Sequence, residues 1–353
     1  MSKLLLLFVP LLSILALSSE SRAIDRNDAK IPVIVETDIG QFMDDAWALT
    51  FLLKDPQVDI RLIVVSTNNT ELRAQIVAKL CASSSHKSIP IAIGDKTSDY
   101  AGPQSHWAAS YNLTSYPGPV IRTSAAVAVA TALKSALLAG ERVHLVELSP
   151  PIVFSEVAQT YPELVSAAAA HASFMGGCFR YGYGHSPGQT TEYNAKFNIS
   201  ATDGLLRAQF GTPLQLSPLD TSAQVKVAGD NYQRVLAAAQ KDGLLGALVE
   251  SFRVWWGMCP YDPLGIMCPP NDPESYTSSL FDLQAAAFAS SYADSLRRFV
   301  VVEKSQPVAI NATGFTNVVP EGSPADIFME WNDLSGFMTE VIGAIVKDEY
   351  EIE

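Results

Sequence analysis

The fold is decided by one stretch near the start of the chain, residues 31–53, which read IPVIVETDIGQFMDDAWALTFLL. Its first part, residues 31–36, is a short apolar run that suits a strand buried in a parallel sheet. From Asp44 to Leu53 the apolar residues recur at the spacing of a helix. The stretch therefore predicts a strand, an acidic loop and a helix, which together form the repeating unit of an α/β fold.

The alternation of strand and helix continues along the chain. Further strands are expected at residues 59–66, 89–93 and 143–148, helices at 71–83 and 125–139, and another apolar segment at 167–176. This alternation predicts an α/β domain with a Rossmann-like core, in which an open, mostly parallel sheet is flanked by helices. Ligands bind such sheets at the carboxyl ends of the strands. The candidate positions follow Glu36, Ser66, Leu148 and Gly177.

Residues 1–23 have the composition of a signal peptide. Lys3 supplies the positive charge, residues 4–17 form the apolar run, and Ser21 and Ala23 are small residues near a cleavage point. The run is shorter than a membrane span of about 20 residues, although an uncleaved anchor is the alternative interpretation. We therefore expect a secreted protein, extracellular or vacuolar, with no membrane attachment after cleavage. Residues 24–353 are expected to form a single domain with a loop-rich insertion at about 255–279.

The net charge argues against one class of partner. Asp and Glu outnumber Lys and Arg by 37 to 24, which gives a formal net charge of -13 at pH 7. An acidic surface repels a phosphate backbone, so no nucleic-acid polymer is expected as a ligand. The same charge suits the binding of cations, although it does not locate a site.

Cysteines and sequons are compatible with a secretory route. Cys259 and Cys268 lie nine positions apart in a loop-like stretch and are expected to form a disulfide. Cys81 and Cys178 are expected to be free buried thiols, and the cysteine spacings do not resemble those of a zinc site. Sequons for N-glycosylation begin at Asn68, Asn112, Asn198 and Asn311.

The most informative charged residues lie in the loop of the opening stretch. Asp38, Asp44 and Asp45 crowd the junction between the expected strand and helix, and Gly40 permits a tight turn. Carboxylates packed this closely repel one another, and burial increases the repulsion unless a cation lies among them. Hard carboxylate oxygens favour Ca²⁺ or Mg²⁺ over zinc. The alternative interpretation is an acidic helix start beside a solvated loop.

This segment resembles the first signature of the inosine-uridine-preferring nucleoside hydrolase family, an Asp-x-Asp followed by a Gly and an Asp-Asp pair, with Glu36 in the first place. Other segments of the family are matched in the right order. They are residues 66–70 (STNNT), 89–94 (IPIAIG), 145–150 (LVELSP), 174–177 (FMGG), 195–198 (AKFN), 218–221 (PLDT) and 279–282 (SLFD). A single match is weak evidence, whereas an ordered series over nearly the whole mature chain is strong evidence.

The resemblance implies a nucleoside hydrolase fold and an enzyme that cuts the N-glycosidic bond of ribonucleosides with water. It implies one Ca²⁺ held by Asp38, Asp45, the carbonyl oxygen of Leu148 and Asp282. Asp38 takes the place of the catalytic base, which removes a proton from a calcium-bound water. The implied partners are a small-molecule nucleoside and further copies of the chain in a homodimer or homotetramer.

The same matches imply the substrate contacts. Asp44, Asn69, Asn198 and Asp282 take positions that hold ribose hydroxyls, and Met175, Lys196 and Phe281 take other substrate positions. Asn69 has the alternative role of a turn residue, and Asn198 that of a glycosylated loop residue. Recognition of paired hydroxyls by several polar groups would favour ribose over deoxyribose.

Three departures from the family pattern affect the pocket and leave the cation ligands intact. Lys196 replaces a Glu at the 5′ end of the sugar, Phe281 replaces a His that aids the leaving base, and Val153 replaces an Asn. In the alternative arrangement Lys196 points to solvent, and a loop residue such as Gln189, Thr190 or Asn194 takes over its contact. The identity of the leaving base therefore stays open.

Two other classes of protein are alternatives to this interpretation. A phosphatase of the haloacid dehalogenase type needs an Asp nucleophile where this chain has Glu36, and it needs a later Lys and acidic pair that are not found. A non-catalytic secreted protein could keep the fold and bind a nucleoside or a partner. Retention of Asp38, Asp44, Asp45 and Asp282 favours the enzyme.

Overall fold

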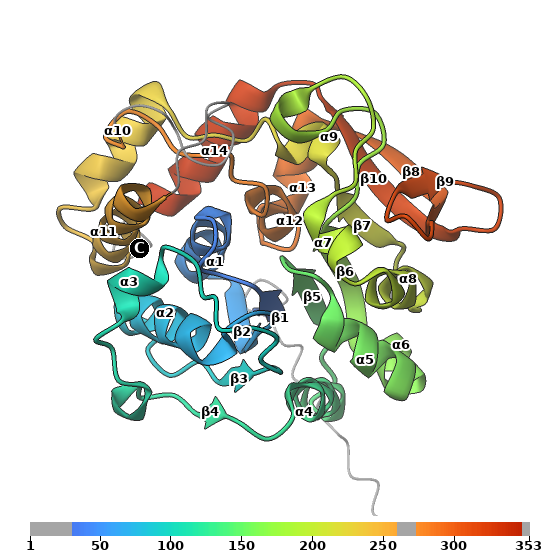
Figure 1. The fold of residues 1–353 in the computed structure, drawn as a ribbon, viewed down its shortest axis with the longest axis horizontal. Helices are drawn as coiled ribbons and strands as arrows, with labels where there is room; N and C mark the ends of the chain where they lie inside the picture. Colours follow the sequence, from blue (N-terminus) through green and yellow to red (C-terminus); the bar gives the residue numbers. More distant parts are fainter. Residues whose placement is uncertain (1–29, 260–272, 348–353) are drawn as a thin grey trace, which may run out of the picture.

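The centre of the molecule is one large sheet. Its strands are β1 (Ile31–Thr37), β2 (Val58–Val65), β3 (Ile91–Ile93), β4 (Val120–Ile121), β5 (Val143–Glu147), β6 (Ala169–Met175), β7 (Leu214–Ser217), β8 (Val300–Ile310), β9 (Thr316–Val318) and β10 (Ser323–Trp331). They form a ten-stranded sheet in the order β4-β3-β2-β1-β5-β6-β7-β10-β8-β9 (Figure 1). The strands from β4 to β10 in this order pair in parallel, whereas β8 pairs antiparallel with β10 and with β9. The expected open, mostly parallel sheet is therefore confirmed.

Helices pack on both faces of this sheet. One face is covered by α1 (Asp44–Lys54), α2 (Thr70–Ala82), α10 (Gly229–Ala238), α11 (Gly243–Met258), α12 (Leu283–Ala287) and α14 (Leu334–Val346). The other is covered by α4 (Ala125–Leu138), α5 (Ile152–Thr160), α6 (Pro162–Ala168) and α8 (Ile199–Arg207). Shorter helical segments are α3 (Ser105–Ala108), η1 (Leu113–Ser115), η2 (Tyr183–His185), α7 (Tyr193–Phe197), α9 (Leu219–Ser222), α13 (Ala293–Leu296) and η3 (Arg297–Phe299).

Strand β1 shows why the opening stretch is apolar throughout. Val33 and Val35 pack into the core on one face of the sheet, and Ile34 packs into the core on the other. Successive side chains of a strand point to opposite faces, so a strand covered on both faces needs apolar residues at every position.

The chain changes direction across the sheet at β1. Strands β1 to β4 are placed successively toward one edge, and β5 then pairs with the other side of β1. The boundary between β1 and β5 is therefore a topological switch point, where the connecting loops separate and leave a crevice. Asp38, just after β1, and Leu148, just after β5, line a pocket at this crevice.

A second loop supports the loop between β1 and α1. Gly40 has a φ of +127°, and a Cβ atom added there would lie 2.4 Å from the carbonyl oxygen of Ala101. A Cβ atom on Gly102, whose φ is +80°, would lie 2.1 Å from the carbonyl oxygen of Gly40. That oxygen also accepts the backbone N–H of Gln104 at 3.1 Å. The two backbones approach so closely that both positions require glycine.

The computed structural model describes residues 30–259 and 273–347. The expected signal peptide and Cys268, the expected disulfide partner of Cys259, lie outside these ranges. Helix α11 continues to Met258, so residues 255–258 of the expected loop-rich insertion are helical, and Trp255 is buried there against Phe252. Cys81 and Cys178 are free and buried, as expected. In the described part of the chain, no helix is long and apolar enough to cross a membrane.

Candidate active site

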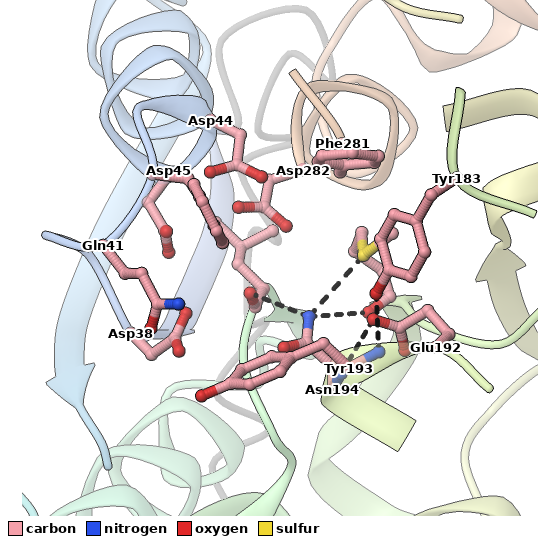
Figure 2. Close-up of a pocket in the computed structure, with 13 residues that line it drawn as sticks. Asp38, Gln41, Asp44, Asp45, Tyr183, Glu192, Tyr193, Asn194, Phe281 and Asp282 are labelled. Atoms are coloured by element: carbon pink, nitrogen blue, oxygen red, sulfur yellow. Dashed lines mark hydrogen bonds between the residues drawn. The ribbon is translucent and has the colours of Figure 1, made fainter. Parts of the chain in front are cut away.

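A pocket opens at the switch point and brings together segments that are far apart in the sequence (Figure 2). Aspartates from the β1–α1 segment face the segment that contains Glu192 and Asn194, and Asp282 completes the acidic side. The aromatic rings of Tyr183 and Phe281 line another part of the same pocket.

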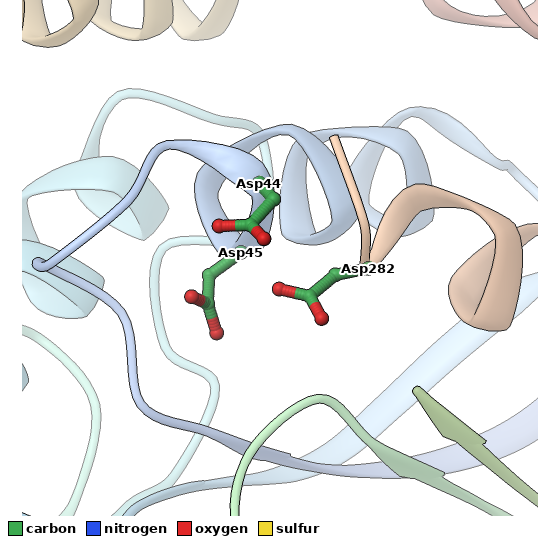
Figure 3. A group of neighbouring side chains, drawn as sticks. All are labelled: Asp44, Asp45 and Asp282. Atoms are coloured by element: carbon green, nitrogen blue, oxygen red, sulfur yellow. The ribbon is translucent and has the colours of Figure 1, made fainter. Parts of the chain in front are cut away.

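Three buried aspartates form the acidic centre of the pocket. Asp44 and Asp45 begin α1, Asp282 precedes α12, and each offers a carboxylate oxygen within 4.8 Å of the others (Figure 3). The packing of α1 against α12 brings them together. Their exposed fractions are 5%, 3% and 2%, so water provides little solvation of their charges.

Burial makes the charged forms of these side chains unfavourable. It raises the pKa of Asp44 to about 7, with the charge of Asp38 as the second cause. The pKa values of Asp45 and Asp282 are raised well above the usual range, first by burial and then by the neighbouring aspartates. Oδ1 of Asp44 is buried and has no hydrogen-bond partner among the described residues. A hard divalent cation among these carboxylates would offset their repulsion, so the donor set fits Ca²⁺ or Mg²⁺.

Asp38 is held by a cationic side chain. Its Oδ2 lies 3.2 Å from Nη1 of Arg73, and the Thr67 hydroxyl donates to the same oxygen at 3.5 Å. Burial raises the pKa of Asp38, and the positive charge of Arg73 opposes that rise. Arg73 belongs to α2 and is itself fully buried. The candidate base is therefore fixed in position by contacts inside the protein.

The facing wall is formed by the start of α7. Glu192 accepts the backbone N–H groups of Asn194 at 2.7 Å and Ala195 at 2.8 Å. The Asn194 amide donates to the carbonyl oxygens of Leu148 at 3.2 Å and Met175 at 3.1 Å (Figure 2). Burial raises the pKa of Glu192 to about 7. This wall presents a buried carboxyl group and a fixed amide to the pocket.

Aromatic side chains complete the lining. Phe42, Tyr183, Tyr193 and Phe281 all contribute to it. The rings of Tyr183 and Phe281 meet edge to face with centroids 5.9 Å apart, and the Tyr183 hydroxyl oxygen accepts the N–H of Tyr193 at 2.9 Å. Burial raises the pKa of both tyrosines, that of Tyr193 to about 12, so both hydroxyls stay neutral at physiological pH. The pocket thus combines acidic groups with an aromatic surface that can stack on a flat ring.

The structure places most of the predicted site residues in this pocket. They are Asp38, Asp44, Asp45, Leu148, Met175, Phe281 and Asp282. Asn69 and Asn198 instead cap helices, because their side-chain oxygens accept the N–H groups of Leu72 and Ala201. Lys196 is exposed and does not line the pocket. Asn69, Asn198 and Lys196, which were predicted to contact the substrate, therefore lie outside the lining of this pocket.

A second segment with a similar pattern lies just upstream of residues 195–198. Residues 191–194 (TEYN) contain an acidic residue, an aromatic residue and an Asn in succession. They lie four positions upstream of residues 195–198 (AKFN), which were matched to the family. Glu192 and Asn194 line the pocket, whereas Asn198 is the N-cap of α8. The short helix α7 buries Asn194 and turns Lys196 to solvent. Glu192, and not Lys196, therefore presents a charged side chain to the pocket.

Sequence reasoning also missed Arg73, Tyr183 and Tyr193. An arginine in the apolar part of a helix indicates a buried acidic partner, and this signal was available for Arg73. Tyr183 lies in an irregular loop, and no sequence pattern distinguishes it from the other tyrosines. Val153, named as a departure, is buried, and its backbone N–H donates to Glu36 at 3.0 Å.

The fold and the pocket together define an α/β protein with a carboxylate-lined site at the switch point of its sheet. Nucleoside hydrolases are proteins of this class. The chain matches the profile of the family described as inosine-uridine preferring nucleoside hydrolase over residues 33–323. It therefore belongs to the inosine-uridine preferring nucleoside hydrolase family. Family membership supports a nucleoside-hydrolysing enzyme. A sequence search among curated proteins found no match.

Solved structures show the same fold. A plant nucleoside hydrolase aligns with a TM-score of 0.70 at 16% identity, covering 90% of this chain and 99% of that one. An inosine-uridine preferring nucleoside hydrolase from Bacillus anthracis aligns with a TM-score of 0.66 at 16% identity, covering 89% and 99%. The type III effector protein XopQ, complexed with adenosine diphosphate ribose, aligns with a TM-score of 0.64 at 16% identity, covering 90% and 94%.

Proposed function

We propose that this chain is a calcium-dependent hydrolase that cleaves the N-glycosidic bond of ribonucleosides with water, giving a free base and ribose. The observation that carries the proposal is the group of buried aspartates at the switch point, next to a fixed carboxylate, Asp38. Family membership supports the reaction class.

The cation would be held by Asp38, Asp45, Asp282 and the carbonyl oxygen of Leu148, all of which line the pocket. A bound divalent cation would supply a positive charge that lowers the pKa of a water held beside it. The Asn194 amide fixes the Leu148 carbonyl, and the Thr37 hydroxyl donates to Asp45. These contacts set the direction of the ligand oxygens before any ligand arrives.

Asp38 is proposed to take the proton from the attacking water, as a general base. Arg73 and Thr67 hold its Oδ2, so the carboxylate needs little reorganisation when the substrate binds. The sugar develops positive charge as its bond to the base breaks, and the surrounding carboxylates of Asp44 and Asp282 stabilise that charge.

Asp44, Glu192 and Asn194 are proposed to hold the sugar hydroxyls. Oδ1 of Asp44 is buried without a partner in the described structure, and a ribose hydroxyl could donate to it. A substrate that lacks this hydroxyl leaves the oxygen unpaired, and such a loss costs about 1–3 kcal/mol. This cost is the basis for the proposed preference for ribonucleosides over deoxyribonucleosides. The base is proposed to stack against Phe42, Tyr183 or Phe281, which line the pocket.

A hydrolysis screen tests the proposal. Calcium-loaded protein is incubated with inosine, adenosine, guanosine, uridine and cytidine, and released base and reducing sugar are both measured. We expect release from at least one ribonucleoside, less from its 2′-deoxy analogue, and none with Asp38→Asn. No release from any ribonucleoside by calcium-bound, folded protein would overturn the proposal.

The second candidate is a non-catalytic secreted protein that binds a nucleoside-like ligand. It is favoured by one observation, that XopQ, which shares this fold, was solved with adenosine diphosphate ribose bound. Isothermal titration with the same nucleosides and with adenosine diphosphate ribose separates the two candidates. Binding without release of sugar supports the second, and turnover supports the first.

We also propose that the chain is secreted after cleavage near Ala23 and that it forms a homodimer or homotetramer. The apolar run at residues 4–17 and the four sequons support the secretory route. Expression of the full chain in a eukaryotic host, with N-terminal sequencing of the protein in the medium, tests the cleavage. Light scattering on the same sample gives the oligomeric state.

A further inference from the structure

Arg73 is a buried cation beside the acidic pocket that the proposed reaction does not use directly. It lies in α2, the helix that follows β2, and its side chain reaches Asp38 at the end of β1. It is among the largest fully buried side chains of the described structure. Arginine is almost never fully buried without a charged partner, so its surroundings identify what it serves.

The guanidinium makes its hydrogen bonds through one nitrogen. Nη1 lies 3.2 Å from Oδ2 of Asp38, 3.1 Å from the hydroxyl oxygen of Thr67 and 3.3 Å from the carbonyl oxygen of Ser66. Nε and Nη2 are buried and have no hydrogen-bond partner among the described residues. A buried charge with so few local hydrogen bonds is unfavourable unless other charges compensate it.

The compensating charges are those of the pocket aspartates. Nη1 of Arg73 lies 3.2 Å from Oδ2 of Asp38, and Asp38 lines the same pocket as Asp45. These two residues are among the proposed cation ligands. Without a bound cation, Arg73 is thus the fixed positive charge that offsets their mutual repulsion, and a bound cation would have to enter beside it.

The backbone between β2 and α2 is shaped to hold this contact. Thr67 and Asn68 have φ values of 58° and 51°, a left-handed conformation that residues other than glycine rarely adopt. Thr97 keeps the chain there, because its hydroxyl accepts the N–H of Asn68 at 2.7 Å and its own N–H donates to the Asn68 carbonyl at 3.0 Å. The Thr67 hydroxyl is thereby placed within reach of both Arg73 and Asp38.

We propose that Arg73 is a positioning residue that holds Asp38 by one carboxylate oxygen and that its fixed charge keeps the cation affinity of the site below what the aspartates alone would give. The role of Asp38 in this inference rests on the proposed function, whereas the effect on cation affinity needs no turnover. Removing the charge should tighten cation binding and slow turnover. A merely structural arginine would weaken both when removed.

The test is a calcium titration of protein from which metal has been stripped with EDTA. Isothermal titration calorimetry, without nucleoside, measures the Kd. Since like charges at close range repel, Arg73→Met should bind Ca²⁺ with a Kd at least about tenfold lower than that of the wild type. Arg73→Lys keeps the charge, and its Kd should stay within about threefold of the wild-type value. The matched control is Lys79→Met, which removes a cation from the same helix where it contacts the Trp107 carbonyl, and its Kd should not change.

Turnover is measured on the same variants at saturating Ca²⁺. Arg73→Met should lower kcat at least about tenfold, because Asp38 loses the partner that orients it. Arg73→Lys should recover part of that loss, and Lys79→Met should leave kcat unchanged. Equal kcat values for Arg73→Met and wild type, on a nucleoside that the wild type hydrolyses, would overturn the positioning role.

Unchanged or weaker calcium binding by Arg73→Met would overturn the proposed effect of Arg73 on cation affinity. A lack of calcium binding in both the wild type and Arg73→Met would overturn it as well. If Arg73→Met does not fold, Arg73→Gln makes the same test, because it is neutral and keeps a donor for the Ser66 carbonyl. The titration contains no nucleoside, so tighter binding supports the inference whether or not sugar is released. Failure of the proposed function shows separately, as wild-type protein that binds Ca²⁺ and releases no sugar.

Discussion

Two groups of buried carboxyl side chains lie near the ends of β1 and β5, and their surroundings differ. Glu36 and Glu147 form an enclosed pair, whereas Asp44, Asp45 and Asp282 form the cluster that lines the pocket. The oxygens of Glu36 accept the backbone N–H groups at the start of α5, at 3.0 Å and 2.8 Å. Oε1 of Glu147 accepts the N–H and the hydroxyl of Ser149, at 3.0 Å and 2.7 Å.

The enclosed pair needs no external charge. Burial raises the pKa of Glu36 to about 6, while burial and the Glu36 carboxylate raise that of Glu147 well above the usual range. The carboxyl groups of Glu147 and Glu36 lie within hydrogen-bond reach of each other, and one shared proton would satisfy both. Oε2 of Glu147 and Oδ1 of Asp44 are both buried without a hydrogen-bond partner in the described structure, but only in the pocket cluster do three carboxylates each offer an oxygen within 4.8 Å of the others. Burial alone does not indicate a cation site, whereas three buried carboxylates gathered at close range do.

The largest expected difference between the two groups is in turnover. Asp38→Asn, next to the cluster, removes the proposed base and weakens a cation ligand, so kcat should fall at least about thousandfold, or about 4 kcal/mol of barrier. Glu147→Gln, in the enclosed pair, should leave kcat within about threefold. Both are measured on a nucleoside that the wild type hydrolyses, at saturating Ca²⁺. A folded Asp38→Asn protein with near-wild-type kcat would remove Asp38 from its role.

The next effect is on stability in the presence of calcium. A ligand that binds only the folded state at 100 times its Kd should raise the free energy of unfolding by about 2.7 kcal/mol. Asp45→Asn and Asp282→Asn should lose most of this gain, and Glu147→Gln should keep it. Urea denaturation with EDTA and with Ca²⁺ gives the difference. An equal gain in the cluster variants and the wild type would place the ion elsewhere.

A smaller effect is expected in the pH dependence of the calcium-free protein. The folded-state pKa values of Asp44 and Glu192 are raised to about 7 from 3.8 and 4.5. Between these limits the unfolded chain has released protons that the folded protein still binds, so the free energy of unfolding falls as pH rises. We expect a loss of about 2 kcal/mol from pH 5.5 to 7.5, measured by urea denaturation with EDTA. Asp44→Asn should reduce the slope, and a flat wild-type profile would contradict the assignment.

The smallest effect separates the two members of the enclosed pair. Glu36→Gln replaces a carboxylate that accepts two N–H groups, and we expect a loss of about 1.5 kcal/mol in the free energy of unfolding. Glu147→Gln keeps a hydrogen-bond donor toward Glu36 and should cost less than about 0.5 kcal/mol. Thermal and urea denaturation of both variants measure the difference. Equal losses would mean that the pair does not share its proton as described.

Most of the parallel sheet could be predicted because its strands are buried on both faces. β1 and the end of β2, residues 62–65, are therefore apolar runs that stand out from the helices between them. The antiparallel end formed by β8, β9 and β10 was missed. β8 has a mixed pattern of exposed and buried residues, and its pairing with β10 joins residues that no local pattern relates.

The residues of the candidate site were also only partly predicted. Asp38, Asp44 and Asp45 were found because they belong to one short segment whose crowding is visible in the sequence. Glu192 was not assigned and Asn194 was named only in the alternative arrangement, because two similar segments lie four residues apart and only burial tells them apart. Arg73 was missed because its partner is 35 positions away and meets it only in the folded chain.

The close approach of Gly40 and Gly102 has a consequence for inheritance. Any side chain at position 102 would collide with the backbone of the loop between Asp38 and Asp44, although Gly102 offers no chemical group to a ligand. In a saturation mutagenesis screen scored on activity, we therefore expect position 102 to tolerate as few residues as the aspartates do. During evolution, the backbone of the loop between Asp38 and Asp44 can therefore change only together with the loop that contains Gly102.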